Sequence, residues 1–496
     1  MRRRPSAALA LAIAGVVGST ATASARMSAD TMSAPPDEMS GIDAEWWAAA
    51  AEPYAGTTIT GVSESTPPSV YAAETLAAQF EELTGIAVEL EATSWDEMRN
   101  KALNDMENNT GVYDFIYVEQ DIAYADIAAE RLTNLSEMYA DNTDLQAPGF
   151  SWDEFNTFLD NFADADGNYF GVPMEAFIKI YLYRTDLFGD ADLQAAFEEQ
   201  YGYPLAPATT HDQYRDIAEF FTAHGTDNDL ELWGTTVQAT TSHAASFYEF
   251  FESVAPTFGL YDWGINAEEN FAATVDNGGA MNGPEAVAAL EYWVSLLDFA
   301  PPESTSSTWD EVASTFAAGR AAQGLVYGEN ATWIAADGSR SSVVGNVGVA
   351  VPPLADGVLE AAESGEGYVG YYDGGAFAIP AGADDKEATL LWLQFLGLPD
   401  VQPEWAAATG RVTENATYDA PAITAIDEEV GGYFTLMQEQ AQLFRGAPPF
   451  AFHSQVVSTV SPFIWSAILG DSTPQEALDA AAEATEEELT NLGYRT

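Results

Sequence analysis

Segments of strand length alternate with segments of helical spacing from residue 57 onwards. Residues 57–62 alternate apolar and small polar side chains, as a half-buried strand does. A helix with an apolar stripe is predicted over residues 69–84 and ends at Gly85. The alternation continues with a strand over 86–91, a helix over 95–107 and a strand over 114–118. This β-α-β-α-β order predicts a parallel sheet covered by helices.

Polar residues follow two of these predicted strands. Residues 63–66 come directly after the first strand and residues 119–121 after the third. In open sheets of this kind, ligands bind beyond the carboxyl ends of the strands. We therefore expect these two polar clusters to face one site.

A strand with charges in its middle is predicted within residues 167–188. The segment is rich in β-branched and aromatic residues and contains Pro173, Glu175 and Lys179. One interpretation is a half-buried strand with both charges in solvent, since charged side chains are mostly exposed. The other is a crossing of the chain between two lobes, with Glu175 facing the cleft. The residues alone leave both interpretations open.

The same segment resembles the first hinge strand of the extracellular solute-binding proteins of ABC importers, family 1, in the branch that includes the maltose-binding protein. The matching residues are Gly171, Val172, Pro173, Glu175, Tyr181, Tyr183, Asp186, Leu187 and Phe188. Arg184 stands where Lys is usual, and Val118 stands where the maltose binder has a stacking tryptophan. Further similar segments are 80–88, 111–117, 319–330, 368–380 and 410–412. The resemblance extends over residues 57–494, from the first predicted strand almost to the C-terminus.

This resemblance implies an α/β fold of two lobes, the type II periplasmic-binding-protein fold, with a ligand cleft between lobes joined by crossover hinge strands. We predict a first lobe over 51–172 plus 374–415 and a second lobe over 173–373 plus 416–496. The resemblance also implies the substrate-binding component of an ABC transporter, which captures a sugar or polyol and delivers it to the membrane permease. We expect a monomer that uses no cofactor.

A sugar or polyol site needs flat aromatic faces, together with carboxylates, amides or arginine that pair with hydroxyl groups. The candidates near predicted loops are Ser63, Glu64, Trp95, Glu119, Asp121, Glu175, Trp309, Tyr327, Glu329, Asn330, Tyr371, Tyr372, Asp373, Gly374 and Arg411. For each aromatic residue alone, core packing is the competing interpretation. The loop 371–375 is a sharper candidate, because its glycines allow close approach to a ligand and a buried Asp373 would need a partner.

Acidic residues greatly outnumber basic ones. The chain has 78 Asp and Glu against 16 Lys and Arg, a net charge of −62. Such a charge repels nucleic acids and anionic membrane surfaces, so both are excluded as partners. We interpret it as adaptation to a salty exterior, typical of a halophilic protein. Acidic cleft residues would also suit a polyamine or another cationic small solute bound by the same fold.

The N-terminal residues are typical of a secretory signal. Three arginines at 2–4 precede an apolar run over 7–17 and small residues at 23–25. We expect a cleaved signal peptide over 1–25 and a flexible leader over 26–50. Sec and twin-arginine export both stay open. With no Cys, the chain has neither disulfides nor a lipidated cysteine, so we expect a soluble periplasmic protein.

Enzyme signatures are missing from the sequence. It contains no G-x-S-x-G, no H-E-x-x-H and no phosphate loop, so we expect no enzymatic activity. A secreted glycosidase, with two carboxylates about 5 to 9.5 Å apart, is the alternative from another class. A structural surface protein is a third. Residues 164–168 suggest a calcium loop, but Tyr169 stands where an EF-hand needs Gly, so we predict a turn without a metal.

Overall fold

The computed structural model describes residues 41–496. The first three strands in this range are parallel and are covered by helices. Strand β1 (Thr58–Glu64) pairs in parallel with β2 (Ala87–Thr93) and with β3 (Phe115–Glu119). The helices between them are α2 (Pro67–Tyr71), α3 (Ala77–Thr84) and α4 (Trp95–Asn108). The predicted β-α-β-α-β order and parallel sheet are therefore confirmed. The predicted signal peptide over 1–25 lies outside the described residues.

A short helix precedes the first strand. Helix α1 (Ala44–Ala51) begins after Asp43, whose side chain accepts a hydrogen bond from the Trp46 N–H. Trp47 is fully buried and packs edge-on against Phe80 and Phe395, with ring centroids 6.1 Å apart in both pairs. The predicted flexible leader over 26–50 is therefore wrong for residues 44–50. Residues 26–40 lie outside the described part of the chain.

One long strand connects two groups of elements. Strand β4 (Gly171–Arg184) first pairs antiparallel with β7 (Tyr372–Ala378), which itself pairs with β3. Its second half pairs with β5 (Gln323–Tyr327) and β6 (Val347–Ala350). Glu175 and Lys179 are only 1% and 3% exposed, so the interpretation with both charges in solvent is wrong.

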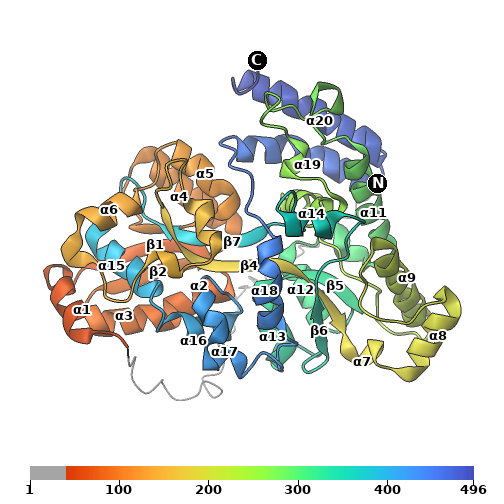
Figure 1. Ribbon diagram of the computed structural model, residues 1–496, viewed down its shortest axis with the longest axis horizontal. Coiled ribbons are helices and arrows are strands. Elements are labelled where there is room, and N and C mark those ends of the chain that lie inside the picture. The colour runs from red at the N-terminus through yellow and green to blue at the C-terminus, as the bar shows by residue number, and fades with distance from the viewer. Residues whose placement is uncertain (1–40) are drawn as a thin grey trace, which may run out of the picture. The chain divides into compact units, whose positions relative to one another are not determined.

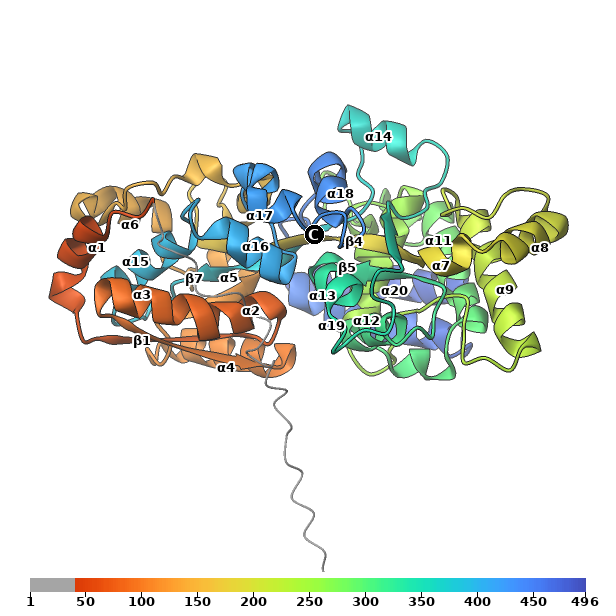
Figure 2. The same cartoon turned by 90° about the horizontal axis from the view of Figure 1, so that it is seen from below.

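The two groups of elements lie on opposite sides of the centre of β4. Helices α1, α3 and α15 (Lys386–Leu396) lie on one side in both views (Figures 1 and 2). Helices α8 (Ala191–Tyr201), α9 (His211–Asp227) and α11 (Pro284–Ser295) lie on the other. These two lobes are joined by β4 and β7, as the crossing interpretation predicted. The exact lobe boundaries, 51–172 with 374–415 and 173–373 with 416–496, stay a prediction.

The remaining helices complete the two lobes. They are α5 (Gln120–Ala128), α6 (Leu135–Asp141), α7 (Thr185–Phe188), α10 (Ala245–Tyr248), α12 (Trp309–Ala317), α13 (Ala331–Ala336), α14 (Val358–Ser364), α16 (Gln402–Thr409), α17 (Pro421–Thr424), α18 (Tyr433–Gln440), α19 (His453–Ile468) and α20 (Pro474–Asn491). The pattern of residues 421–439 predicts a single helix, but the structure has two separate helices there, α17 and α18. Gly431 and Gly432 separate them, because both adopt positive φ angles, 73° and 83°.

The pattern of residues 233–237 predicts a strand, which the structure does not form. Only Trp233 makes a bridge, to Ala321. The Gly234 N–H donates to Thr222 Oγ1 at 2.8 Å, and the Thr235 N–H donates to the Phe299 carbonyl at 3.2 Å. The backbone hydrogen bonds of this segment therefore go to α9 and a loop instead of a neighbouring strand.

Candidate ligand-binding site

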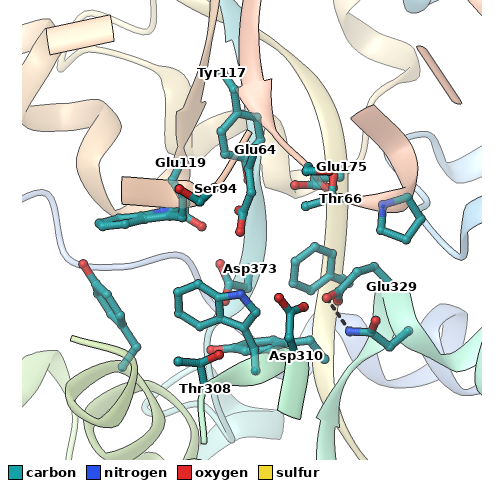
Figure 3. Close-up of a pocket in the computed structure, with 18 of the residues that line it drawn as sticks. Glu64, Thr66, Ser94, Tyr117, Glu119, Glu175, Thr308, Asp310, Glu329 and Asp373 are labelled. Carbon is teal, nitrogen blue, oxygen red and sulfur yellow. Dashed lines mark hydrogen bonds between the residues drawn. The ribbon is translucent and has the colours of Figure 1, made fainter. Parts of the chain in front are cut away.

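A pocket of about 310 Å³ opens where β1 and β3 end and where β4 and β7 cross between the lobes. The first lobe lines it from the loop after β1, the end of β3 and the start of α4. The second lobe contributes α10, the π-helical turn Glu249–Val254 that follows it, the start of α12 and the loop after β5. Figure 3 shows Glu64 reaching into the pocket from one side and Asp310 from the other.

The pocket brings together ten of the fifteen sequence-predicted candidates. They are Glu64, Trp95, Glu119, Asp121, Glu175, Trp309, Tyr327, Glu329, Asn330 and Asp373. The two polar clusters expected after the first and third strands thus lie at one pocket. Their role in binding stays a prediction.

The pocket is strongly acidic. The nine carboxylate side chains that line it are Glu64, Asp96, Glu119, Asp121, Glu175, Glu252, Asp310, Glu329 and Asp373. Few of their oxygens have donors among the residues that the structure describes. Thr66 Oγ1 donates to Glu175 Oε2 at 3.0 Å, Asn330 Nδ2 donates to Glu329 Oε1 at 2.6 Å, and Trp95 Nε1 donates to Glu119 Oε2.

Burial raises the pKa values of most of these carboxylates. It raises the pKa of Asp121 to about 8, of Glu175 to about 7 and of Asp373 to about 6. The pKa values of four further carboxyls are raised well above their usual value, first by burial and then by neighbouring carboxylates: Glu64, Glu119, Glu252 and Glu329. At neutral pH the pocket is therefore only partly ionised.

Aromatic rings supply the apolar surface of the pocket. Trp95 packs edge-on against Tyr248, with centroids 6.4 Å apart, and against His243 at 6.0 Å. Trp309 also packs edge-on against His243, at 5.3 Å. Tyr327 and Phe177 pack edge-on against each other, at 5.7 Å. Rings and carboxylates in one pocket can hold a small ligand with both apolar C–H faces and polar groups.

A comparison with known families decides what kind of protein this is. Residues 75–431, more than half of the chain, match the model of the bacterial extracellular solute-binding proteins. The chain belongs to this family. The resemblance seen in the sequence is thereby confirmed.

Solved structures of other solute-binding proteins have the same fold. Maltose-bound T. maritima MalE3 is 20% identical, with a TM-score of 0.69, and the match covers 88% of this chain and 100% of that one. An ABC transporter solute-binding protein from Agrobacterium radiobacter K84, in complex with ribitol, is 21% identical (TM-score 0.67; coverage 87% and 99%). Another from Agrobacterium vitis S4, with bound D-mannitol, is 18% identical (TM-score 0.67; coverage 88% and 99%). These matches confirm the predicted two-lobed α/β fold.

Five predicted candidates of this solute-binding protein do not line the pocket. They are Ser63, Tyr371, Tyr372, Gly374 and Arg411. Ser63 Oγ is hydrogen-bonded to Ser69 Oγ at 2.8 Å, and the Tyr372 hydroxyl accepts from Asn156 Nδ2 at 3.0 Å. Tyr371 is 3% exposed and belongs to the core of the second lobe. These side chains support the pocket from behind.

Gly374 allows β7 to lie close to β4 where the two strands pair. Its φ is 119°, and a Cβ there would lie 2.3 Å from the Glu175 carbonyl oxygen. The glycine expected to admit a ligand instead admits the backbone of β4. The neighbouring Asp373, whose Oδ1 accepts the Gly374 N–H at 2.7 Å, does line the pocket.

Sequence reasoning missed several residues that line the pocket. They include Asp96, Tyr117, Phe177, His243, Tyr248, Glu252, Thr308 and Asp310. Tyr248 and Glu252 lie four residues apart, a spacing that places two side chains on one face of a helix. Asp310 directly follows the candidate Trp309. Both signals were present in the sequence.

Within residues 41–496 no group of three or more His, Asp or Glu is arranged to hold a metal ion. The suspected calcium loop is a turn, in which Asp164 Oδ1 accepts the backbone N–H groups of Asp166 and Asn168, each at 2.9 Å. None of the described helices is both long and apolar enough to cross a membrane.

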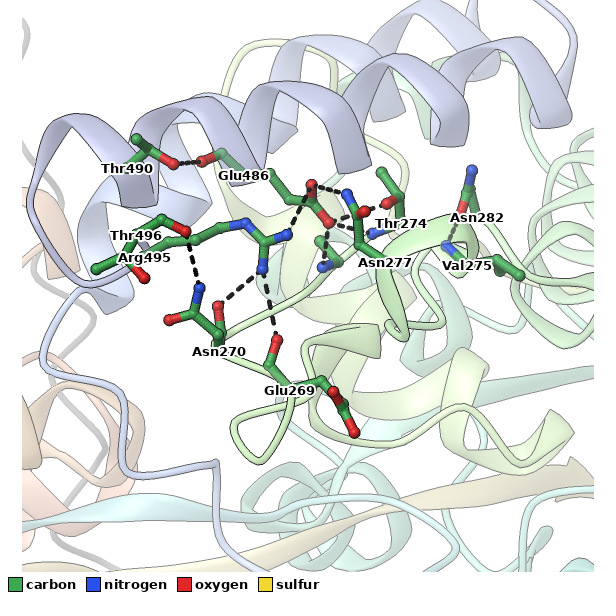
Figure 4. Close-up of polar contacts among 11 residues, drawn as sticks. Glu269, Asn270, Thr274, Val275, Asn277, Asn282, Glu486, Thr490, Arg495 and Thr496 are labelled. Atoms are coloured by element: carbon green, nitrogen blue, oxygen red, sulfur yellow. Dashed lines mark hydrogen bonds and ion pairs between the residues drawn. The ribbon is translucent and has the colours of Figure 1, made fainter.

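A second hollow lies between the loop 274–282 and α20, but its central carboxylate is already used (Figure 4). Glu486 accepts hydrogen bonds from the Ala273 N–H, the Thr274 N–H and the Thr274 hydroxyl, each at 2.9 Å. Asn277 Nδ2 donates at 2.6 Å, and Arg495 pairs with the same carboxylate at 3.3 Å. Glu486 therefore fastens the loop to the C-terminal helix.

We expect Glu486→Gln to lower the free energy of unfolding by about 1–3 kcal/mol. Partial burial alone would raise the pKa of Glu486, but the Thr274 and Ala273 hydrogen bonds hold it below its usual value. A lowered pKa adds stability above the unfolded-state value that is lost as the pH falls through the folded-state value. Urea unfolding should show the difference at pH 7 and a smaller one near pH 3. Glu487→Gln, at the exposed next position, is the control.

Proposed function

We propose that this protein is the periplasmic solute-binding component of an ABC importer, which captures a sugar- or polyol-like solute and delivers it to the membrane permease. The observation that carries the proposal is the pocket between the lobes, where Trp95, Trp309 and Tyr327 lie beside carboxylates from both lobes. Ribitol, D-mannitol and maltose bound to proteins of the same fold support this class of solute.

Binding would act through closure of the lobes. Glu64 and Glu119 come from the first lobe, whereas Trp309 and Glu329 come from the second. A solute that contacts residues of both lobes favours the closed arrangement, in which the two lobes are close together. Strands β4 and β7 are the connections that would bend during closure. The permease would then distinguish the closed, loaded form from the open one.

The proposed activity is binding without turnover. Thermal unfolding of the purified protein should be measured with ribitol, mannitol, sorbitol and maltose, and the sugar recovered afterwards should be analysed by chromatography. A ligand at a hundredfold its dissociation constant adds about 2.7 kcal/mol of stability, which gives a clear rise in melting temperature. Recovery of cleaved maltose would instead favour the glycosidase alternative.

We expect Trp309→Ala to weaken binding of the stabilising sugar or polyol about tenfold, because the ring face that packs on the C–H groups is lost. Trp309 lies at the start of α12 and contributes little to the core, so the variant should remain folded. Isothermal titration calorimetry provides the affinity. Trp152→Ala, which removes a half-buried ring from a cluster with Tyr139 and Phe150, is the matched control and should bind normally. Equal binding by both variants would contradict the role of Trp309.

A further inference from the structure

The acidic lining of the pocket has no counter-charge of its own. Among residues 41–496, neither Lys nor Arg lines it, while nine carboxylates do. His243 lies 3.5 Å from Asp96 at the edge of the lining. Burial lowers the pKa of His453, which is 3.3 Å from Asp121, to about 3, so that ring is neutral at physiological pH. The carboxylates therefore face one another without a cation among the lining residues.

The nearest cations behind the pocket are paired elsewhere. Lys179 Nζ contacts Glu249 and donates to Gln238 Oε1 at 3.0 Å. Arg99 pairs with Asp126 at 2.7 Å. Lys179 and Arg99 each already have a carboxylate partner. Arg411, which faces Glu175 from behind, donates to Gln402 and Thr413 and does not line the pocket.

Three carboxylates that line the pocket each have one oxygen without a hydrogen-bond partner among the described residues. Asp121 Oδ1, Glu252 Oε1 and Glu329 Oε2 are buried and find no hydrogen-bond donor within residues 41–496. Their residues are 5%, 4% and 7% exposed, and all three line the pocket. Figure 3 shows the Glu64, Asp310 and Glu329 side chains pointing into the same space. Buried acceptors without donors are unfavourable, so the arrangement is completed only when a ligand supplies donors.

Adaptation to salt does not explain why these carboxylate side chains are buried in the pocket. An acidic surface adapted to salt consists of exposed carboxylates in contact with water and counter-ions. Residues that are 4–7% exposed are removed from that surface. A neutral sugar would supply hydroxyl donors, but it would bring no positive charge to balance those carboxylates that are ionised. An ammonium group supplies three donors together with the missing positive charge.

We propose that the solute of this importer is a sugar or polyol that carries an amino group, with its ammonium held by Asp121, Glu252 and Asp373 and its hydroxylated body against the Trp95 and Trp309 rings. This inference rests on the proposed function and narrows its substrate class. The charged and titratable groups that face the three carboxylates are Glu64, Arg99, Glu119, Glu175, Lys179, Tyr248, Tyr327, Glu329, Tyr371 and His453.

The test compares matched ligands that differ in one amino group. Calorimetry on the mature protein should use sorbitol against its amino analogue glucamine, and glucose against glucosamine, with spermidine as an amine without hydroxyl groups. We expect each amino compound to bind at least about tenfold more tightly than its neutral partner. Raising NaCl from about 0.1 to about 1 M should weaken amine binding and leave neutral binding unchanged.

The pH dependence gives an independent readout. Ammonium binds the ionised carboxylates, and the pKa values of Asp373, Glu175 and Asp121 are raised to about 6, about 7 and about 8. Affinity for glucamine should therefore increase from about pH 5 to about pH 8, with protons released on binding. Affinity for sorbitol should change little over the same range.

Substitutions of Asp121 and Glu252 test whether these carboxylates cause the preference for amines. Asp121→Asn and Glu252→Gln should each reduce the ratio of amine to neutral affinity about tenfold, and thermal unfolding checks that each is folded. The surface variant Glu487→Gln should keep the parent ratio. Unchanged ratios in both pocket variants would overturn the assignment of these residues.

The remaining outcomes separate this inference from the proposed function. If neutral and amino partners bind equally and independently of salt, the amine requirement is overturned and the importer assignment stands. If spermidine binds tightly while glucamine and glucosamine do not, the hydroxylated part of the assignment is overturned. If no sugar, polyol or amine binds, the proposed function falls and this inference falls with it.

Discussion

Replacing Lys179 by Met is expected to lower the free energy of unfolding by about 3–5 kcal/mol, because Glu249 would remain as a buried charge without its partner. Both residues are 3% exposed. Lys179 Nζ contacts Glu249, donates to Gln238, and lies 3.9 Å from the centroid of the Tyr327 ring. Burial raises the pKa of Glu249, and Lys179 opposes this shift. Urea unfolding at pH 7 measures the loss.

The second half of this experiment is a rescue. Adding Glu249→Gln to Lys179→Met removes the stranded carboxylate, so the double variant should recover part of the lost stability. Lys101→Met is the comparison on the surface, where Lys101 pairs with Glu91 and Glu97. Exposed pairs contribute little, so its effect should be much smaller. A double variant no more stable than Lys179→Met would contradict the ion-pair explanation.

The burial of Lys179 also shows what the sequence could and could not predict. The sequence places Lys179 and Glu175 as charges within a strand and leaves two interpretations open, one of which is a crossing between lobes. The strand pattern cannot decide whether its charges are exposed. That depends on β7 and on the π-helical turn Glu249–Val254, which come from distant parts of the chain.

The first sheet was more predictable, because it depends on local patterns. Alternating strands and helices specified β1, β2 and β3 in sequence order, and parallel pairing follows from their helical connections. The polar residues after β1 and β3 therefore lie at one edge, as expected. Local patterns failed where tertiary contacts took over, as at residues 233–237, whose backbone bonds to α9, and at Trp47, which is anchored between Phe80 and Phe395.

The candidate site was predicted best where a strand fixes the direction of the side chains. Glu64, Glu119 and Glu175 lie on strands, and all three line the pocket. Tyr371 and Tyr372 were candidates because of neighbouring glycines, yet both point into packed regions. Side-chain type alone could not separate residues that face the pocket from those directly behind it. Arg411 is the strongest example of this difficulty.

Arg411 was selected as a ligand-binding candidate, but the structure buries it completely outside the pocket. Its guanidinium lies 3.9 Å from the centroid of the Trp405 ring. Nη1 donates to Gln402 Oε1 at 2.8 Å, and Nη2 donates to Thr413 Oγ1. Burial lowers the pKa of Arg411 to about 9 and raises that of the nearby Glu414 to about 8. The arrangement indicates a structural charge that holds α16 to the segment after it.

We expect Arg411→Met to lower the free energy of unfolding by about 3–5 kcal/mol, while the remaining folded protein keeps its ligand affinity within about twofold. The raised pKa of Glu414 means that its contribution is fully present at low pH and is lost as the pH rises through about 8. Without Arg411 the pKa of Glu414 rises further, so that loss extends to higher pH and the variant should differ more from the parent at pH 9 than at pH 6. Urea unfolding at both pH values measures this.

Calorimetry on the folded variant separates the two roles of Arg411. A residue that binds ligand lowers affinity when removed, whereas a residue that supports α16 lowers only stability. Arg445→Met is the matched control, since Arg445 is exposed and lies over the Tyr368 ring at 5.2 Å, where its loss should affect stability much less. A large loss of affinity in Arg411→Met with unchanged stability would indicate that Arg411 binds the ligand and would contradict its structural role. The expected result leaves recognition to the carboxylates and rings that line the pocket.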